Sequence, residues 1–144
     1  MGILAKEDSR MTNLPPSNLP LLKRTFSDII QSERDVDQTG KTSSLICQRK
    51  TFVFFDGSCL SITEFIKDEK IDYYYYDWYS KKKSLIKFHS EEHVDKTYQT
   101  ETEPFHIHAH GLIDDKRLAN PTLQDLFSIL QCIRMCLLVF NSYK

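Results

Sequence analysis

No apolar run in the 144-residue sequence reaches the 18 or more residues that a membrane-spanning helix needs. The first residues carry Glu7 and Asp8 and no apolar segment of the signal-peptide kind, so we expect a cytoplasmic protein with no membrane contact. An excess of one charge is also lacking, since 19 Lys and Arg stand against 20 Asp and Glu. The net charge of -1 argues against a dominant, sequence-independent affinity for nucleic acid and leaves room for a local basic patch.

The four cysteines form no C-x-x-C pair, and the nucleotide-binding patterns G-x-G-x-x-G and G-x-x-x-x-G-K-[ST] are absent. Cys132 and Cys136 are four residues apart in an apolar helical pattern, which places both thiols on one helix face. We expect reduced, structural thiols. The alternative is a zinc site that joins these two cysteines to a histidine.

The apolar pattern predicts a flexible tail over residues 1–16 and a single domain over residues 17–144. A helix is predicted from Ser17 or Asn18 to about Asp35, because apolar residues recur there at helical spacing: Leu21, Leu22, Phe26, Ile29 and Ile30. A second helix is predicted from Pro121 and Thr122 onward, with Thr122 and Asp125 as a weak capping box. Its apolar side should pack on a sheet, burying Leu126, Leu130 and Ile133.

Between the two helices the period of the pattern changes to two, which is typical of strands. Strands are predicted over residues 51–55, 59–65, 71–79 and 84–88, and residues 105–112 would add a fifth. The turns between the first four strands are too short for a crossover helix, so these strands must form an antiparallel meander. The predicted fold is α+β: an N-terminal helix, a four- or five-stranded antiparallel meander and a C-terminal helix packed on the sheet.

All five histidines lie within a 22-residue window: His89, His93, His106, His108 and His110. Imidazole is well suited to proton transfer and to metal ligation near neutral pH. On a strand, the last three histidines would share one face, and neighbours two residues apart would lie about 7 Å apart, close enough to act on one atom. Three interpretations stay open: an acid–base site, a polar sheet edge without chemistry, and a zinc or other divalent metal site built from His89, His93, His106 and His108.

The tyrosine-rich strand over residues 71–79 alternates two sets of rings. One face carries Tyr73, Tyr75 and Tyr79, and the other carries Tyr74, Tyr76 and Trp78. One set should be core. The other could stack on bases, beside a turn of three lysines that could hold phosphate. The alternative is cross-strand aromatic packing with a solvated lysine turn. In the functional interpretation, the substrate-binding residues are Lys81, Lys82, Lys83, Tyr75 and Trp78.

Several short motifs occur in a defined order between Phe52 and Leu130. A hairpin with Asp56-Gly57-Ser58, then Leu60 and Glu64, precedes a strand that ends Tyr75-Tyr76-Asp77-Trp78. After this strand come Lys87-Phe88 and His93, then Pro104-Phe105 and His106-Ile107-His108-Ala109-His110, and last the helix from Pro121. This order resembles that of the TumE-like toxin components of prokaryotic toxin–antitoxin modules. His89 stands where that family usually has Asp.

The resemblance implies a small prokaryotic toxin that is neutralised by a cognate antitoxin, for example one of helix-turn-helix type. The target that it leads us to expect is RNA. One base and one acid can cleave an RNA phosphodiester without a metal, so no cofactor is required on this interpretation. His93 and His108 are the predicted catalytic pair, with His106 and His110 as substitutes. Lys87 is predicted to stabilise the charge that grows on phosphorus.

Two other functions stay open at the level of sequence. The pattern from His106 to His110 also resembles, over about seven residues, the histidine-triad nucleotide hydrolases. That likeness implies His108 as the nucleophile, with His106 and His110 as its supports. The third interpretation is a metal-binding or regulatory binding protein without catalysis.

Overall fold

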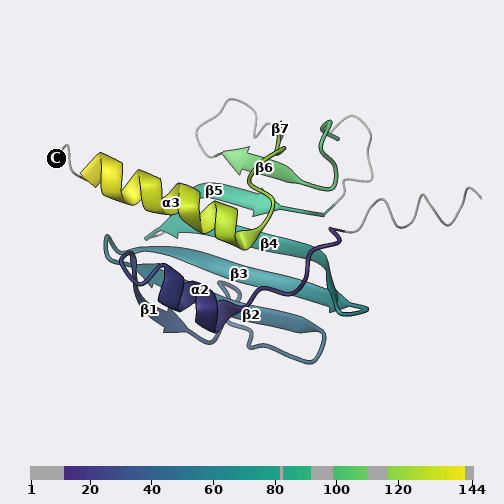
Figure 1. The fold of residues 1–144 in the computed structure, drawn as a ribbon, viewed down its shortest axis with the longest axis horizontal. Helices are drawn as coiled ribbons and strands as arrows, with labels where there is room; N and C mark the ends of the chain where they lie inside the picture. The colour runs from purple at the N-terminus through teal and green to yellow at the C-terminus, as the bar shows by residue number, and fades with distance from the viewer. Residues whose placement is uncertain (1–11, 82, 92–98, 110–116, 142–144) are drawn as a thin grey trace, which may run out of the picture.

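The computed structural model describes residues 12–81, 83–91, 99–109 and 117–141, and these form two helices and one seven-stranded sheet (Figure 1). The elements in chain order are α2 (Leu19–Thr25), β1 (Ile30–Arg34), β2 (Cys47–Phe54), β3 (Ser58–Lys67), β4 (Lys70–Ser80), β5 (Lys83–His89), β6 (His106–Ala109), β7 (Arg117–Ala119) and α3 (Leu126–Asn141). Each strand pairs antiparallel with the next, so the order in the sheet is the order in the sequence. The predicted α+β meander is confirmed, but the sheet has seven strands rather than four or five.

The first predicted helix is much shorter than its apolar pattern indicated. Helix α2 ends at Thr25, and the chain turns and enters strand β1 at Ile30, which pairs with Phe54. Phe26, Ile29 and Ile30 are all buried, as the helical spacing predicted. A tight turn followed by an edge strand delivers the same side chains to the core. Backbone pairing with β2 therefore outweighs the helical propensity of residues 30–34 and makes them a strand.

The second predicted helix begins later than expected, and a short strand precedes it. Asn120 holds residues 120–123 in a turn, because its side-chain oxygen accepts the Leu123 N–H at 2.8 Å and its side-chain nitrogen donates to the Leu123 carbonyl at 2.6 Å. The N-cap is Asp125, whose carboxylate accepts from the Ser128 N–H at 3.1 Å and from the Ser128 hydroxyl at 2.6 Å. The predicted capping box at Thr122 and Asp125 is wrong. In the part of the chain that the structure describes, no helix is long and apolar enough to cross a membrane.

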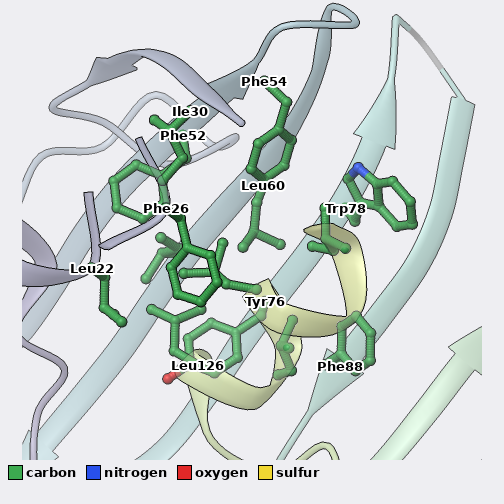
Figure 2. Packing of buried hydrophobic residues seen from close by; sticks show 14 of the residues in the cluster. Leu22, Phe26, Ile30, Phe52, Phe54, Leu60, Tyr76, Trp78, Phe88 and Leu126 are labelled. Carbon is green, nitrogen blue, oxygen red and sulfur yellow. The ribbon is translucent and has the colours of Figure 1, made fainter. Parts of the chain in front are cut away.

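Both helices pack on the same face of the sheet. The core combines α2, α3 and the alternate residues of the central strands that point toward them, among them Phe52, Leu60, Tyr76, Trp78 and Phe88 (Figures 1 and 2). Leu126, Leu130 and Ile133 of α3 are buried, which confirms the prediction for this helix. No helix of the described residues covers the opposite face, hereafter the open face. The loop between β1 and β2 contacts part of this face, through Asp37 and Gln38.

The segment before α2 contacts the sheet from Thr12 onward. The Thr12 hydroxyl donates to the Ile71 carbonyl, and the Ile71 N–H donates to the Leu14 carbonyl at 2.8 Å. Ser17 donates its N–H, at 3.0 Å, and its hydroxyl, at 2.5 Å, to the carboxylate of Glu64. Glu64 is fully buried on β3 and also accepts from Gln48 and from the Tyr76 hydroxyl. This carboxylate therefore joins three separate parts of the chain.

Candidate functional site: a histidine cluster on the open face

The register of strands β4 to β7 brings the polar residues of the site together. His89 of β5 lies opposite Tyr75 of β4 and opposite His106 of β6. Lys87 lies opposite His108, which in turn lies opposite Arg117 of β7. Directly opposed residues in an antiparallel pair present their side chains on the same face. Cross-strand pairing therefore gathers residues from four strands into one patch.

Three imidazole rings contact one another in this patch. The ring centroids of His106 and His108 lie 4.9 Å apart, those of His89 and His108 lie 5.1 Å apart, and those of His89 and His106 lie 5.8 Å apart. Each pair meets edge to face, at interplanar angles of 62° to 86°. We call these three residues the histidine cluster. His89 and His108 are half-buried, and His106 is buried.

A carboxylate behind His89 holds that ring in place. Asp77 lies on β4 and is only 6% exposed, and its Oδ1 is 2.8 Å from His89 Nε2. A carboxylate can only accept, so Nε2 carries the proton of this hydrogen bond. The other carboxylate oxygen accepts from the Gln38 side-chain amide at 2.6 Å. Both oxygens of Asp77 are thus engaged, which fixes the carboxylate and, through it, the imidazole.

His106 is the most enclosed member of the cluster, at 3% exposed. Its Nδ1 lies 3.2 Å from the Pro104 carbonyl oxygen and 4.0 Å from a carboxylate oxygen of Glu103. Both neighbours are acceptors, so Nδ1 is the protonated nitrogen when the ring is neutral. His106 therefore packs against the other two rings and has almost no contact with solvent.

The surroundings of His108 disfavour its charged form. Burial is the largest cause, followed by the nearby His89, His106, Arg117 and Lys87, and together they lower the pKa of His108 to about 4. The Arg117 guanidinium donates from Nε toward His108 Nε2 across 3.5 Å. At neutral pH the His108 ring is therefore neutral and can accept a proton.

These features lie in a chain whose family is shown by comparison with protein-family models. The model described as Toxin TumE matches residues 18–133. This chain belongs to the TumE toxin family. TumE is a toxin component of a toxin–antitoxin system, which implies an antitoxin partner. The match is longer than the likeness in motif order between Phe52 and Leu130, and it includes α2, β1 and the first half of α3. No curated protein and no solved structure matches the chain.

Of the catalytic residues predicted for this TumE-family chain, His106, His108 and Lys87 lie together. His93 and His110 lie outside the described residues, so their roles stay predictions. The structure adds His89, which sequence reasoning considered only as a metal ligand.

The predicted substrate-binding residues are not all in the patch. Tyr75 is in it, with its ring 4.8 Å from His89. Trp78 belongs instead to the core, on the helix side of the sheet, where its indole N–H donates to the Ser58 hydroxyl at 3.0 Å. Strand alternation places it on the face opposite Tyr75 and Asp77, so it cannot contact a ligand at the histidine cluster. Lys81 and Lys83 lie at the β4–β5 turn, at the far end of β5 from His89, and Lys82 lies outside the described residues.

Three residues of the site were missed from sequence: Gln38, Asp77 and Arg117. Asp77 carried a usable signal, since it alternates with Tyr75 on the non-core face of its strand, where an acid among aromatic residues has no packing role. Arg117 lies on a three-residue strand that is too short to show a period. Gln38 comes from the polar loop over residues 35–44, and only folding brings it to Asp77.

The histidine cluster could also hold a metal ion. Among the residues that the structure describes, His89, His106 and His108 are the group whose potential ligand atoms converge, all within 4.8 Å of one another. Zinc with nitrogen ligands at about 2.0–2.1 Å brings those atoms to about 3.3 Å apart, so the rings would close by up to about 1.5 Å. Asp77 behind His89 is the acceptor that metal-bound histidines commonly have. Cys132 and Cys136 are free thiols on α3 and are not in this group.

Proposed function

We propose that this TumE-family toxin acts on RNA and cleaves its phosphodiester bonds by acid–base catalysis at the histidine cluster. The observation that carries the proposal is the contact between His89 and His108, of which one is backed by a buried carboxylate and the other is kept neutral by its surroundings. Two imidazoles held in different environments are what separate base and acid roles require.

His108 is the proposed general base. Its ring is neutral at pH 7 because burial and nearby cations lower its pKa to about 4. The acceptor nitrogen of neutral His108 is Nε2, which lies 3.5 Å from the donor Arg117 Nε. As the guanidinium turns to the phosphate, Nε2 takes the proton of a ribose 2′-hydroxyl, and the 2′-oxygen attacks the adjacent phosphorus. Lys87 and Arg117, which lie opposite His108 on either side, balance the negative charge that develops on the phosphoryl oxygens.

His89 is the proposed general acid. Asp77 fixes its orientation and balances the charge of the ring when it carries two protons. His89 gives a proton to the 5′-oxygen as the bond between that oxygen and phosphorus breaks. The products are a 2′,3′-cyclic phosphate and a 5′-hydroxyl, with every proton accounted for by the two rings. His93, the partner of His108 predicted from sequence, lies outside the described residues, and His89 takes that place in the proposal.

The test is expression of the chain without its antitoxin in a bacterial host. The wild type should slow growth and generate RNA fragments with 2′,3′-cyclic phosphate ends. His108→Ala and His89→Ala should each restore growth, because the loss of one proton transfer costs about 10²–10⁴ in rate. The double variant should be little worse than either single one, since groups that act together are not additive. Ser84→Ala, at the other end of β5, is the matched control and should remain toxic.

Three results would contradict the proposal in different ways. If both single variants fold and stay toxic, the histidine cluster is not catalytic. If purified protein loses its activity in EDTA and regains it with zinc, the three histidines are metal ligands rather than the acid and base. If the wild type is harmless, or toxic without cleaving RNA, a binding role replaces catalysis. Co-expression of the cognate antitoxin should restore growth in every toxic case.

A further inference from the structure

An unbroken line of aromatic rings leads along the open face to the histidine cluster. The rings of Phe65 and Tyr73 are stacked, with centroids 4.3 Å apart and an interplanar angle of 19°. Tyr75 stands edge-on to both, at 5.8 Å from Tyr73 and 6.3 Å from Phe65. Tyr75 in turn stands edge-on to His89 at 4.8 Å. We call Phe65, Tyr73 and Tyr75 the aromatic track.

The aromatic track is not part of the core. Phe65 and Tyr73 are directly opposed on β3 and β4, and alternation places them and Tyr75 on the open face. Their neighbours Tyr74 and Tyr76 point to the other face and are fully buried there. The rings of the track are only half-buried, so each keeps part of its surface in contact with solvent. The core therefore does not account for three aromatic side chains at these positions.

We propose that the aromatic track binds the bases of unpaired RNA by stacking, so that the substrate of the histidine cluster is single-stranded. This inference rests on the proposed function, because it assigns the nucleotides next to the scissile phosphate to the rings next to His89. Bases in a duplex are stacked on each other and paired, whereas those of a single strand can be splayed out onto aromatic side chains.

The charges of the chain favour the same substrate. A net charge of -1 gives no general attraction to phosphates, so binding energy must come from another source, which base stacking supplies. The cations Lys87 and Arg117 lie at the histidine cluster, where a scissile phosphate would sit. At the other end of the track, the Arg49 guanidinium lies 5.8 Å from the centroid of Phe65. Three acidic groups near this face have partners: Asp37 is paired with Arg49 at 3.1 Å, Asp77 with His89, and the exposed Glu91 accepts a hydrogen bond from the Tyr75 hydroxyl.

The experiment measures binding separately from cleavage. The probe is a fluorescent, mixed-sequence 2′-O-methyl oligoribonucleotide, which lacks the 2′-hydroxyl nucleophile and so stays intact. Fluorescence anisotropy should show tighter binding of the single strand than of the same strand annealed to its complement, or of a backbone of equal length without bases. Tyr73→Ala and Phe65→Ala should each raise the Kd about 5- to 150-fold. Tyr73→Phe should bind as the wild type does, and Tyr73→Leu should not, because stacking needs a ring.

Two matched controls separate stacking from damage to the fold. Tyr79→Ala lies on the same strand and the same face as Tyr73 but outside the track, opposite Cys59. Phe55→Ala removes a ring that is 44% exposed in the β2–β3 turn. Both controls should leave the Kd unchanged, and the thermal midpoint of every variant shows whether it is folded.

The outcomes for the track and for the chemistry are distinguishable. Two results would contradict the proposed role of the aromatic track. One is a duplex that binds as tightly as the single strand, and the other is folded Tyr73→Ala and Phe65→Ala variants that bind like the wild type. If the variants lose binding but the natural RNA is not cleaved, the track stands and the proposed chemistry fails. If cleavage occurs and the variants bind normally, the chemistry stands and the track falls.

Discussion

His108 should titrate near pH 4, well below the ordinary value of 6.5 for a histidine. Burial is the main cause, followed by the neighbouring His89 and His106 and then by the cations Arg117 and Lys87. At pH 5, about one tenth of His108 should carry a proton, whereas about 97% of an unperturbed imidazole would do so. Histidine C–H signals of the selectively labelled protein, followed by NMR against pH, measure this midpoint directly.

The same shift sets the sign of a pH effect on stability. The folded chain binds this proton less tightly than the unfolded chain, whose His108 has a pKa near 6.5. The contribution of His108 to the free energy of unfolding is therefore fully present above about pH 6.5 and is lost as the pH falls toward about 4. With a discount for solvent screening of a half-buried ring, the loss is on the order of 1–2 kcal/mol. Urea unfolding of wild type and His108→Ala at pH 7 and pH 5 measures it.

Variants separate the causes of the shift. Arg117→Ala removes a nearby positive charge but leaves His108 largely buried. It should therefore raise the pKa of His108 only part of the way toward the ordinary value of 6.5. If His108 is the general base, the acidic limb of the rate profile should have its midpoint near pH 4 and should move with the NMR midpoint in this variant. A His108 midpoint near 6.5 in the folded wild type would refute the reasoning. So would an acidic limb that stays in place when the NMR midpoint moves.

Two further predictions concern the fold. Leu130→Ala should lower the free energy of unfolding by about 2–5 kcal/mol because Leu130 is completely buried on the side of α3 that packs on the sheet. Leu138→Ala, at a site 43% exposed on the same helix, should cost far less, and equal effects in urea unfolding would contradict this packing. Glu64→Ala should cost about 2–5 kcal/mol, because it leaves the buried donors of Ser17 and Tyr76 without their acceptor, and the exposed Glu101→Ala serves as its control. A change at Glu64 as small as that at Glu101 would show that water replaces the carboxylate.

Local pattern was enough to predict the central part of the fold. Strands β2 to β5 follow from period-two alternation, and their antiparallel order follows from turns that are too short for a crossover. Asp56 and Gly57 mark one such turn, where Gly57 has φ +89°, a conformation that side chains disfavour, and where the Asp56 carboxylate accepts the Ser58 N–H at 3.0 Å. The apolar face of α3 could also be predicted, because the helical spacing of apolar residues is regular over a long stretch.

The strands at the two edges of the sheet, β1 and β7, could not be predicted from the sequence. Residues 30–34 show apolar spacing that suits a helix, and they form strand β1 because β2 offers them a row of backbone partners. Arg117 and its neighbours form strand β7 for the same reason, beside β6. A short segment has no intrinsic preference strong enough to resist a free sheet edge, so its conformation depends on residues far away in the sequence.

The sequence alone determined that histidines cluster and that they alternate with apolar residues. It did not determine which of them meet, because that depends on the register between strands: His89 joins His106 and His108 since β5 pairs with β6 at those positions. It also assigned no role to Asp77, Gln38 or Arg117, which give the rings their orientation and their charge environment. Hydrogen bonds and desolvation act over a few ångströms, and those short distances arise only when strands from distant parts of the chain lie side by side.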